Sequence, residues 1–250
     1  MVYYPEKDFE WNLLNIYNYR KKGKFDSYFN FLKMNLKKPG DLVEAGVFQG
    51  SSILSTALFL KENNSKKIIY GFDSFSGFPK HKNKNDDVSM FYKLKKEKLI
   101  SNEQFRNFKK SIEILNKTSK NKKDFSSISS SKNFSNTKKS SILKKIKYLG
   151  LDNIKLIDGQ FDKTMKAFKP RNTILAGILD CDLYMSYHYS LNYLWPLLEK
   201  NGLFFLDEYY SIKFPGAKIA CDEFIKKNRA KLIKFKSPKI SFERWGMKKI

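Results

Sequence analysis

The sequence predicts an α/β fold in which a mainly parallel sheet of seven strands carries helices on both faces. Three observations support this fold class: strand-like and helix-like segments alternate along most of the chain, a glycine-containing turn joins one strand to the following helix, and two later strands end in pairs of acids. Strands separated by helices imply right-handed crossovers and a parallel sheet that is covered on both faces. The 250 residues are enough for one domain, residues 1–250, with a substantial core.

The N-terminal residues 1–38 are predicted to be helical. Apolar residues recur at helical spacing in two runs, which are Phe9, Leu13, Ile16 and Tyr17, and then Phe25, Phe29, Leu32 and Leu36. Pro39-Gly40 ends this segment. Beyond it, further helices are expected at residues 51–61, 140–149, 186–199 and 216–227.

Seven segments have the apolar pattern of strands: residues 41–47, 67–72, 153–158, 173–180, 202–207, 231–236 and 240–248. The last two flank Ser237-Pro238-Lys239, so we expect them to form a C-terminal antiparallel hairpin that completes the sheet. Ligands of such sheets bind outside the carboxyl ends of the strands. The polar residues at those ends are therefore the candidates for a site.

The alternation of strands and helices stops between residues 80 and 148. Residues 93–147 hold 16 Lys and one Arg against four acids, a net charge of +13, which is over half of the +24 of the whole chain. Residues 116–141 are dominated by Ser, Lys and Asn, a composition that predicts a mobile or disordered loop because little apolar area offsets the ordering entropy. We interpret 80–148 as a basic insertion or lid.

The composition argues against membrane-spanning and disulfide-rich proteins. Apolar stretches are only a few residues long, whereas a membrane span needs about 20. The N-terminus lacks a basic and then apolar pattern, so we expect no signal peptide. Cys181 and Cys221 offer neither a disulfide framework nor paired metal-ligand spacing. These features favour a cytoplasmic protein, and they leave open whether it forms a homo-oligomer.

The turn at residues 41–52 is the first candidate for ligand binding. Gly46 and Gly50 lie at the strand exit and helix entry, where the backbone turns tightly and a ligand approaches it closely. Asp73, 23 residues beyond Gly50, ends the next strand and is suited to accept hydrogen bonds from ribose hydroxyls. Asp158-Gly159 ends the third strand, either beside an adenine ring or as a simple turn. Together they favour a Rossmann-like site for an adenosine-containing ligand.

Four acids form the second candidate site. Asp180 and Asp182 follow one apolar strand, and Asp207 and Glu208 follow the next. If these strands are neighbours, at a spacing of about 4.8 Å, the acids converge at one edge of the sheet. Such close charges raise one another's pKa unless a cation lies among them, and oxygen ligands suit Mg²⁺ or another hard divalent ion. Helix capping explains one or two of these acids, Asp182 above all, but not all four.

With these motifs in view, the sequence resembles the macrocin O-methyltransferase family of class I S-adenosylmethionine-dependent enzymes. The matching segments are VEAGVFQGSS, GFDSFSGFP, IDGQFDKTM, LDCDLYMSYHYSLNYLWPLL and LDEYYSIKFPGAKIACDEF. They cover residues 41–80 and 153–225, and the last two are specific to the family. The resemblance implies a Rossmann-like class I methyltransferase domain that methylates a hydroxyl of a sugar, a glycosylated small molecule or a glycan, using S-adenosylmethionine and a divalent metal such as Mg²⁺.

The resemblance also implies roles for individual residues. Those expected to line the cofactor are Glu44, Gly46, Gly50, Ser51, Asp73 and Ser74, with Asp158 and Gly159 near its adenine. Asp180, Asp207 and Glu208 are expected to hold the metal, and Asp182 to be the base. Many family members carry Asp-Asp where this chain has Asp207-Glu208, a difference of one methylene with the same charge. We can place no matching segment for residues 93–141, where the family has lid and substrate-contacting elements, so the acceptor cannot be carried over.

Two other classes of protein are kept as alternatives. The basic insertion suits a nucleic-acid methyltransferase or a nucleic-acid-binding protein, because lysines neutralise phosphates. No Asn-Pro-Pro-Tyr-like motif follows Asp180, which counts against methylation of base amino groups. A nicotinamide-dependent oxidoreductase also has an acid after its second strand, but here the glycine pattern is incomplete and no hydride-transfer acid is evident.

Overall fold

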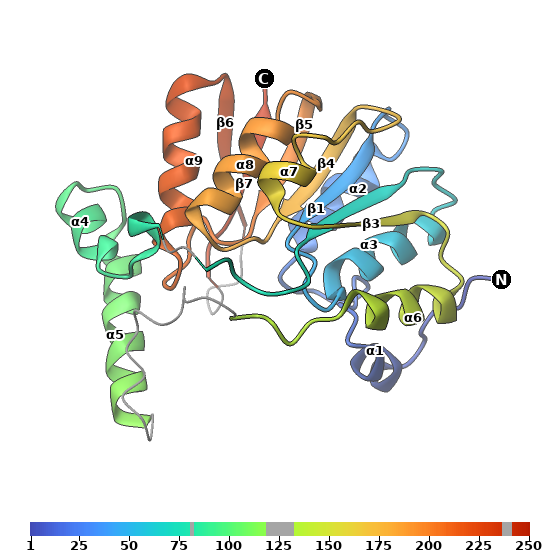
Figure 1. Ribbon diagram of the computed structural model, residues 1–250, viewed down its shortest axis with the longest axis horizontal. Helices are drawn as coiled ribbons and strands as arrows, with labels where there is room; N and C mark the ends of the chain where they lie inside the picture. Colours follow the sequence, from blue (N-terminus) through green and yellow to red (C-terminus); the bar gives the residue numbers. More distant parts are fainter. Residues whose placement is uncertain (81–82, 119–132, 237–241) are drawn as a thin grey trace.

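The computed structural model describes residues 1–80, 83–118, 133–236 and 242–250. Figure 1 shows a central sheet with helices on both sides of it. Within these ranges the sheet has seven strands in the order β3-β2-β1-β4-β5-β7-β6. They are β1 (Asp41–Ala45), β2 (Ile69–Asp73), β3 (Ile154–Asp158), β4 (Ile174–Leu179), β5 (Leu198–Leu206), β6 (Ala230–Phe235) and β7 (Arg244–Lys249).

The pairing of the strands confirms the predicted fold class. β3, β2, β1, β4 and β5 run parallel, and β7 is antiparallel to both of its neighbours, β5 and β6. The C-terminal hairpin is therefore present, with its second strand inserted next to β5. The predicted turn at residues 237–239 lies outside the described residues.

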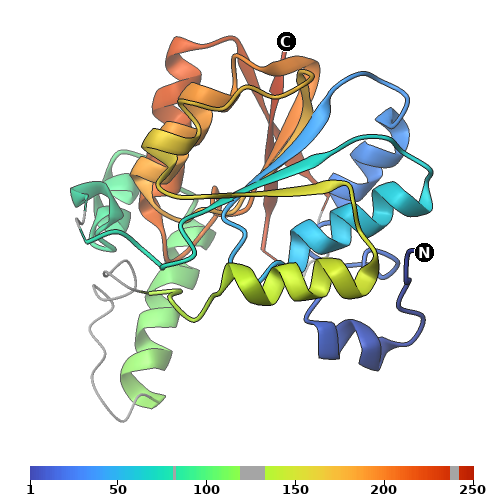
Figure 2. The ribbon, with the colours of Figure 1, turned by 45° about the vertical axis from the view of Figure 1, so that its right-hand side comes forward.

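Helices pack on both faces of the sheet. They are α1 (Asp8–Leu14), α2 (Asp26–Asn35), α3 (Ser51–Glu62), α4 (Met90–Lys96), α5 (Asn102–Thr118), α6 (Lys139–Leu149), α7 (Phe161–Thr164), α8 (Tyr184–Leu194) and α9 (Pro215–Lys227), with a 3-10 turn η1 (Lys84–Asp86). α2, α3 and α6 pack on one face, and α8 and α9 pack on the other (Figure 2). No described helix is both long enough and apolar enough to span a membrane.

Two hydrophobic cores, one on each face, follow from the alternation of side chains along the strands. In β1, Leu42 belongs to the core under α2 and α3, whereas Val43 and Ala45 belong to the core under α8 and α9. All five residues of β1 are buried, as expected for a central parallel strand. Glu44 therefore shares the face of Leu42, which decides where its carboxylate lies.

The N-terminal helices are present, but their buried faces differ in part from the prediction. Phe25, Phe29 and Leu32 are buried as their spacing suggests. In α1, by contrast, Phe9 and Leu13 are 58% and 80% exposed, and Trp11 supplies the buried contact at 2% exposure. The helix has only seven residues, and a position two residues from Phe9 lies on nearly the opposite side of a helix with 3.6 residues per turn.

Residues 84–118 fold into helices that the composition concealed. Helices α4 and α5 share a small core of their own, which consists of Val88, Phe91, Leu94, Ile100 and Phe108. Ile212 and Ile219 connect it to the main body. In Figure 1 these two helices project from the side of the molecule opposite the N-terminus. Most of the predicted mobile stretch, residues 119–132, lies outside the described residues.

Two boundaries near the site also differ from the prediction. Helix α8 ends at Leu194 instead of continuing to residue 199, and β5 begins at Leu198 instead of residue 202. Pro196 explains the first difference, because proline cannot continue a helix. The last residues of β4 and β5 nevertheless stay in register, with Leu179 opposite Leu206, and that pairing positions the acids.

Candidate active site at the carboxyl ends of the strands

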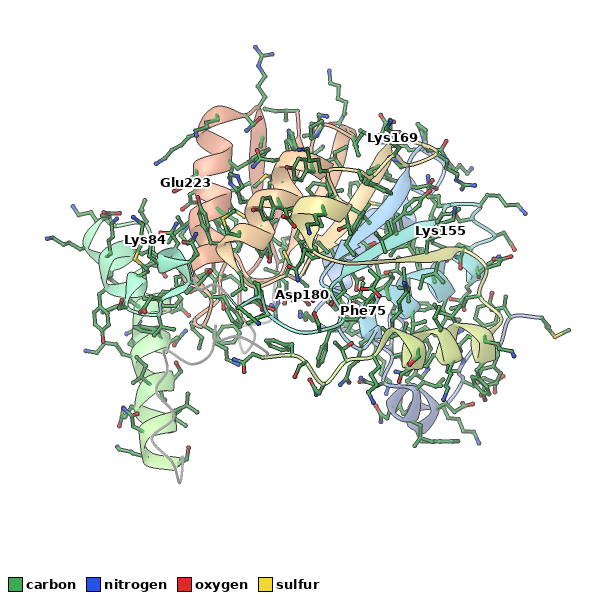
Figure 3. All side chains as sticks on the ribbon, viewed as in Figure 1. Phe75, Lys84, Lys155, Lys169, Asp180 and Glu223 are labelled. Carbon is green, nitrogen blue, oxygen red and sulfur yellow. The ribbon has the colours of Figure 1, made fainter. Side chains whose placement is uncertain are left out.

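A cavity of about 600 Å³ lies at the carboxyl ends of the parallel strands. Most of the predicted site residues line it: Gly46, Ser51, Asp73, Ser74, Gly159, Asp180, Asp182, Asp207 and Glu208. Glu44, Gly50 and Asp158 are not part of its lining. Figure 3 shows Asp180 and Phe75 near these strand ends, whereas Glu223, Lys84 and Lys169 lie farther out.

The glycine turn passes directly against the end of β4. Gly46 has a φ of +91°, and a Cβ there would lie 1.8 Å from the carbonyl oxygen of Asp180. Only glycine combines this backbone conformation with so close an approach. The turn ends at Gly50, which has a φ of +86° and directly precedes the first residue of α3. The turn and the acid cluster are therefore adjacent parts of one site.

Asp73 ties the first two strand ends together. Its Oδ2 accepts a hydrogen bond from the backbone N–H of Phe48, at 2.8 Å, and its Oδ1 accepts one from Phe75, at 2.7 Å. Each carboxylate oxygen has a second lone pair, so the side chain keeps acceptor capacity towards the cavity. Asp158, the corresponding acid of β3, is instead half-exposed and lies 3.7 Å from the ammonium group of Lys139.

Glu44 is fully buried beneath the turn, on the side of α3. Its Oε1 accepts a hydrogen bond of 2.8 Å from Ser52, and its Oε2 has no partner among the described residues. Burial raises the pKa of this carboxyl well above its ordinary value, against the opposing effect of the Ser52 hydrogen bond. A role for Glu44 at the cofactor remains a prediction, and its position makes any such role indirect.

The buried carboxyl of Glu44 predicts a pH-dependent difference between the native chain and a Glu44→Gln variant. Because the folded state raises the pKa of Glu44 above about 4.5, the folded state binds the proton more tightly than the unfolded state. The free energy of unfolding of the native chain should therefore fall relative to the variant as the pH rises above that value. Urea unfolding of both proteins at several pH values between about 5 and 8 measures this difference. Parallel pH profiles would contradict it.

The acids of β4 and β5 converge as the strand pairing requires. Asp180 follows β4, Asp207 and Glu208 follow β5, and one carboxylate oxygen from each lies within 4.8 Å of the other two. Burial and the nearby Asp207 raise the pKa of Asp180 to about 7. Burial also raises the pKa of Asp207. The raised pKa values show that burial and mutual repulsion disfavour the ionised form of these acids.

Two cations that the sequence did not identify contact this cluster. The Nζ of Lys24 lies 2.6 Å from Oδ2 of Asp207 and 3.3 Å from Oδ2 of Asp180. The Nη1 of Arg244 lies 3.4 Å from Oδ1 of Asp207. Lys24 comes from the loop between α1 and α2, and Arg244 comes from β7. Neither position has a local sequence signal, because each reaches the acids only through the tertiary fold.

Asp182 reaches the cavity through an unusual backbone conformation. Its φ of 58° is left-handed, and the N–H of Leu183 donates to the carbonyl of Cys181 at 2.6 Å. Burial, followed by repulsion from Glu208 and Asp180, raises the pKa of Asp182 well above its ordinary value. This conformation returns the chain towards the cavity before α8 begins.

Helix α8 is capped by a residue other than Asp182. The N–H of Tyr184, its first residue, donates to Oδ1 of Asp86 at 2.7 Å. Asp86 belongs to η1 at the start of the 80–148 segment and is buried at 3% exposure. The capping alternative considered for Asp182 is therefore not what the structure shows, and the side chain of Asp182 stays at the cavity.

Aromatic rings form another part of the cavity wall. Phe134 contacts Phe48 and Phe78, with ring centroids 5.4 and 5.0 Å apart, and Phe78 contacts Phe214 at 6.1 Å. All four rings line the cavity. Phe134 lies in the Lys- and Ser-rich segment, and Thr137 from the same segment donates a hydrogen bond to the carbonyl of Phe48. The Lys- and Ser-rich segment thus supplies part of the site.

Several solved methyltransferase structures share the fold of this chain. The O-methyltransferase NovP matches with a TM-score of 0.62 and 17% identity, over 96% of this chain and 80% of that one. The calicheamicin methyltransferase CalS11 matches with a TM-score of 0.60 and 18% identity, over 88% and 77% of the two chains. The Podospora anserina methyltransferase PaMTH1, solved with S-adenosylhomocysteine bound, matches with a TM-score of 0.52 and 10% identity over 96% and 85%.

The seven-stranded sheet of this chain follows the fold of these solved methyltransferases. The family model described as "Macrocin-O-methyltransferase (TylF)" matches residues 33–127 and 116–236. The match includes residues 93–141, for which the sequence motifs gave no counterpart. The chain therefore belongs to the macrocin O-methyltransferase family and is an O-methyltransferase. A search of curated proteins gave no match.

Proposed function

We propose that this enzyme transfers a methyl group from S-adenosylmethionine to a hydroxyl of a sugar or of a glycosylated small molecule or glycan, with the help of a divalent cation such as Mg²⁺. The observation that carries the proposal is the convergence, in one cavity, of the glycine turn and of the acids Asp180, Asp207 and Glu208. Family membership favours O-methylation and a sugar-type acceptor.

The cofactor would occupy the end of the cavity formed by β1, β2 and β3. Gly46 and Ser51 line this end, and Asp73 retains acceptor capacity for ribose hydroxyls. Gly159, with a φ of +139°, lets the backbone after β3 approach a flat ring closely. The arrangement supports a nucleoside ligand, as sequence patterns alone suggested.

The acid cluster fits a divalent cation in its donors and in its charge. All three candidate ligands are carboxylates, the donors that hard cations prefer. The acids Asp180, Asp182, Asp207 and Glu208 carry four negative charges when ionised, against one positive charge each from Lys24 and Arg244. The two uncompensated charges equal the charge of one such ion.

The residues of the chain then divide the work of methyl transfer. Asp180, Asp207 and Glu208 would hold the ion, which lowers the pKa of an oxygen bound to it. Asp182 would accept the proton of the acceptor hydroxyl, a role for which its raised pKa makes it a stronger base once ionised. The aromatic wall around Phe134 would orient the acceptor and keep water away from the in-line path of the methyl group.

Metal removal tests the proposal most directly. Tritiated S-adenosylmethionine would be incubated with a panel of nucleotide sugars and alkyl glycosides, before and after dialysis of the protein against EDTA. We expect methyl transfer to fall by at least about 100-fold without metal and to return with Mg²⁺. Calorimetric titration should show binding of S-adenosylhomocysteine in preference to NAD. An undiminished rate after chelation would exclude the metal role, and preferential NAD binding would exclude the methyl donor.

The cavity argues against the nucleic-acid alternative at this site. Its ionisable lining includes six acids, Asp73, Asp162, Asp180, Asp182, Asp207 and Glu208, but only two lysines, Lys24 and Lys213. A phosphate backbone would meet net negative charge there, although the chain as a whole carries +24. Most of the lysines therefore lie outside the cavity lining. RNA or DNA binding with a Kd below about 1 μM that weakens steeply with added salt would support the alternative.

A further inference from the structure

The ammonium group of Lys24 lies among the carboxylates that would hold the divalent cation. It is 2.6 Å from Asp207 and 3.3 Å from Asp180, which are two of the three candidate ligands. The side chain of Asp207 is 3% exposed, and that of Lys24 is 35% exposed. A buried carboxylate thus has a partly exposed lysine as its nearer cationic partner.

The backbone that carries Lys24 is fixed in place. The adjacent Phe25 is buried, and its ring centroid is 5.4 Å from that of Phe205 on β5, the strand that leads to Asp207. The N–H of Phe25 donates to the hydroxyl of Tyr17 at 3.3 Å, and the N–H of Tyr17 donates to the carbonyl of Ser51 at 3.2 Å. The segment is thereby attached both to β5 and to the start of α3.

Rotation about the bonds of the Lys24 side chain can move its ammonium group while the backbone stays in place. A lysine ends in a compact charge on a flexible stem of four carbons. The cavity continues beside it, since Lys24 itself is part of the lining. Arg244, the other cation at Asp207, contacts Oδ1 of Asp207 alone, whereas Lys24 contacts Oδ2 of Asp207 and Oδ2 of Asp180. Lys24 therefore bridges two of the candidate ligands, whereas Arg244 contacts one of them.

A divalent ion and the ammonium group of Lys24 would compete for the same oxygens. Asp180 and Asp207 hold the ammonium group and would also hold the ion, and like charges at such short range repel strongly in a partly buried site. We infer that Lys24 is a resident counter-ion of the acid cluster, which pairs with Asp180 and Asp207 until a divalent ion displaces its ammonium group into the cavity. This inference rests on the metal site of the proposed function.

Metal affinity tests the competition without any acceptor. Binding of Mn²⁺ would be measured by electron paramagnetic resonance for the native protein and for Lys24→Met, which keeps the stem and removes the charge. We expect the variant to bind Mn²⁺ about tenfold more tightly. Lys213→Met is the matched control, because Lys213 lines the same cavity but makes no ion pair with these acids among the described residues. Its Mn²⁺ affinity should equal that of the native protein.

Chemical labelling of the native protein tests the displacement without a variant. Acetylation of Lys24 by acetic anhydride, followed by mass spectrometry, should increase when Mg²⁺ replaces EDTA. Lys67 should stay protected in both conditions, because its ammonium group donates to the carbonyl of Gly40 at 2.6 Å, and the exposed Lys109 should stay reactive. Unchanged labelling of Lys24 together with equal or weaker Mn²⁺ binding by Lys24→Met would overturn the inference alone. Absence of Mn²⁺ binding in every protein would remove the proposed metal site as well.

Discussion

Replacing Asp182 by asparagine is expected to lower kcat for methyl transfer by about 10²- to 10⁴-fold, the range associated with loss of a general base. Asparagine has nearly the same shape, but it cannot accept the hydroxyl proton. Asp182 lies outside the group of three carboxylates whose oxygens are within 4.8 Å of one another. Binding of Mn²⁺ and of S-adenosylhomocysteine should therefore persist in the variant, so that the loss appears in kcat.

The measurement compares rates with tritiated S-adenosylmethionine and the best acceptor from the sugar panel. Asp152→Asn serves as the control, since Asp152 is a 78% exposed surface acid that pairs with Lys61. It should keep the native rate. If Asp182→Asn also kept that rate, the base would have to be another acid, and Asp180 would be the first to examine because its pKa is raised to about 7.

Replacing Gly46 by alanine is expected to destabilise the fold by at least about 3 kcal/mol, because backbone strain and a steric overlap act together. The new Cβ would lie 1.8 Å from the carbonyl oxygen of Asp180 and 2.7 Å from its carbonyl carbon, and φ is +91°. Neither backbone segment can yield without moving β1 or β4. The same displacement would shift Asp180 away from Asp207, so Mn²⁺ binding should weaken too.

The Gly50→Ala variant separates the effect of steric overlap with a neighbouring backbone from the effect of backbone strain at positive φ. Its φ of +86° is similar, but the nearest atom to a new Cβ is a side-chain carbon of Ile142 at 3.1 Å. The expected loss is therefore only about 1–2 kcal/mol, the cost of a left-handed conformation for alanine. Urea unfolding of the two variants and the native protein gives both values. Equal losses would show that contact with Asp180 does not constrain the turn.

Much of the fold was predictable from local patterns. The strands β1 to β5 and the helices α3, α6, α8 and α9 follow from apolar periodicity, and the acids after β4 and β5 follow from their position at strand ends. Helices α4 and α5 were missed because their lysines were assigned to the basic segment, although Phe105, Phe108 and Ile112 have helical spacing and the small core contains Phe108. The prediction of the buried side of α1 was wrong, because a helix of two turns can pack on either side.

The sequence by itself determined the strands, most of the helices and the residues that lie at the strand ends, because these depend on spacing along the chain. Only the tertiary structure decided the direction of Glu44, since β1 is buried on both faces and its pattern does not say which face is next to the cavity. It also brought Lys24 to Asp180, 156 residues away, and Phe134 to Phe48. Such contacts depend on how separate elements pack against one another, and no local pattern records them.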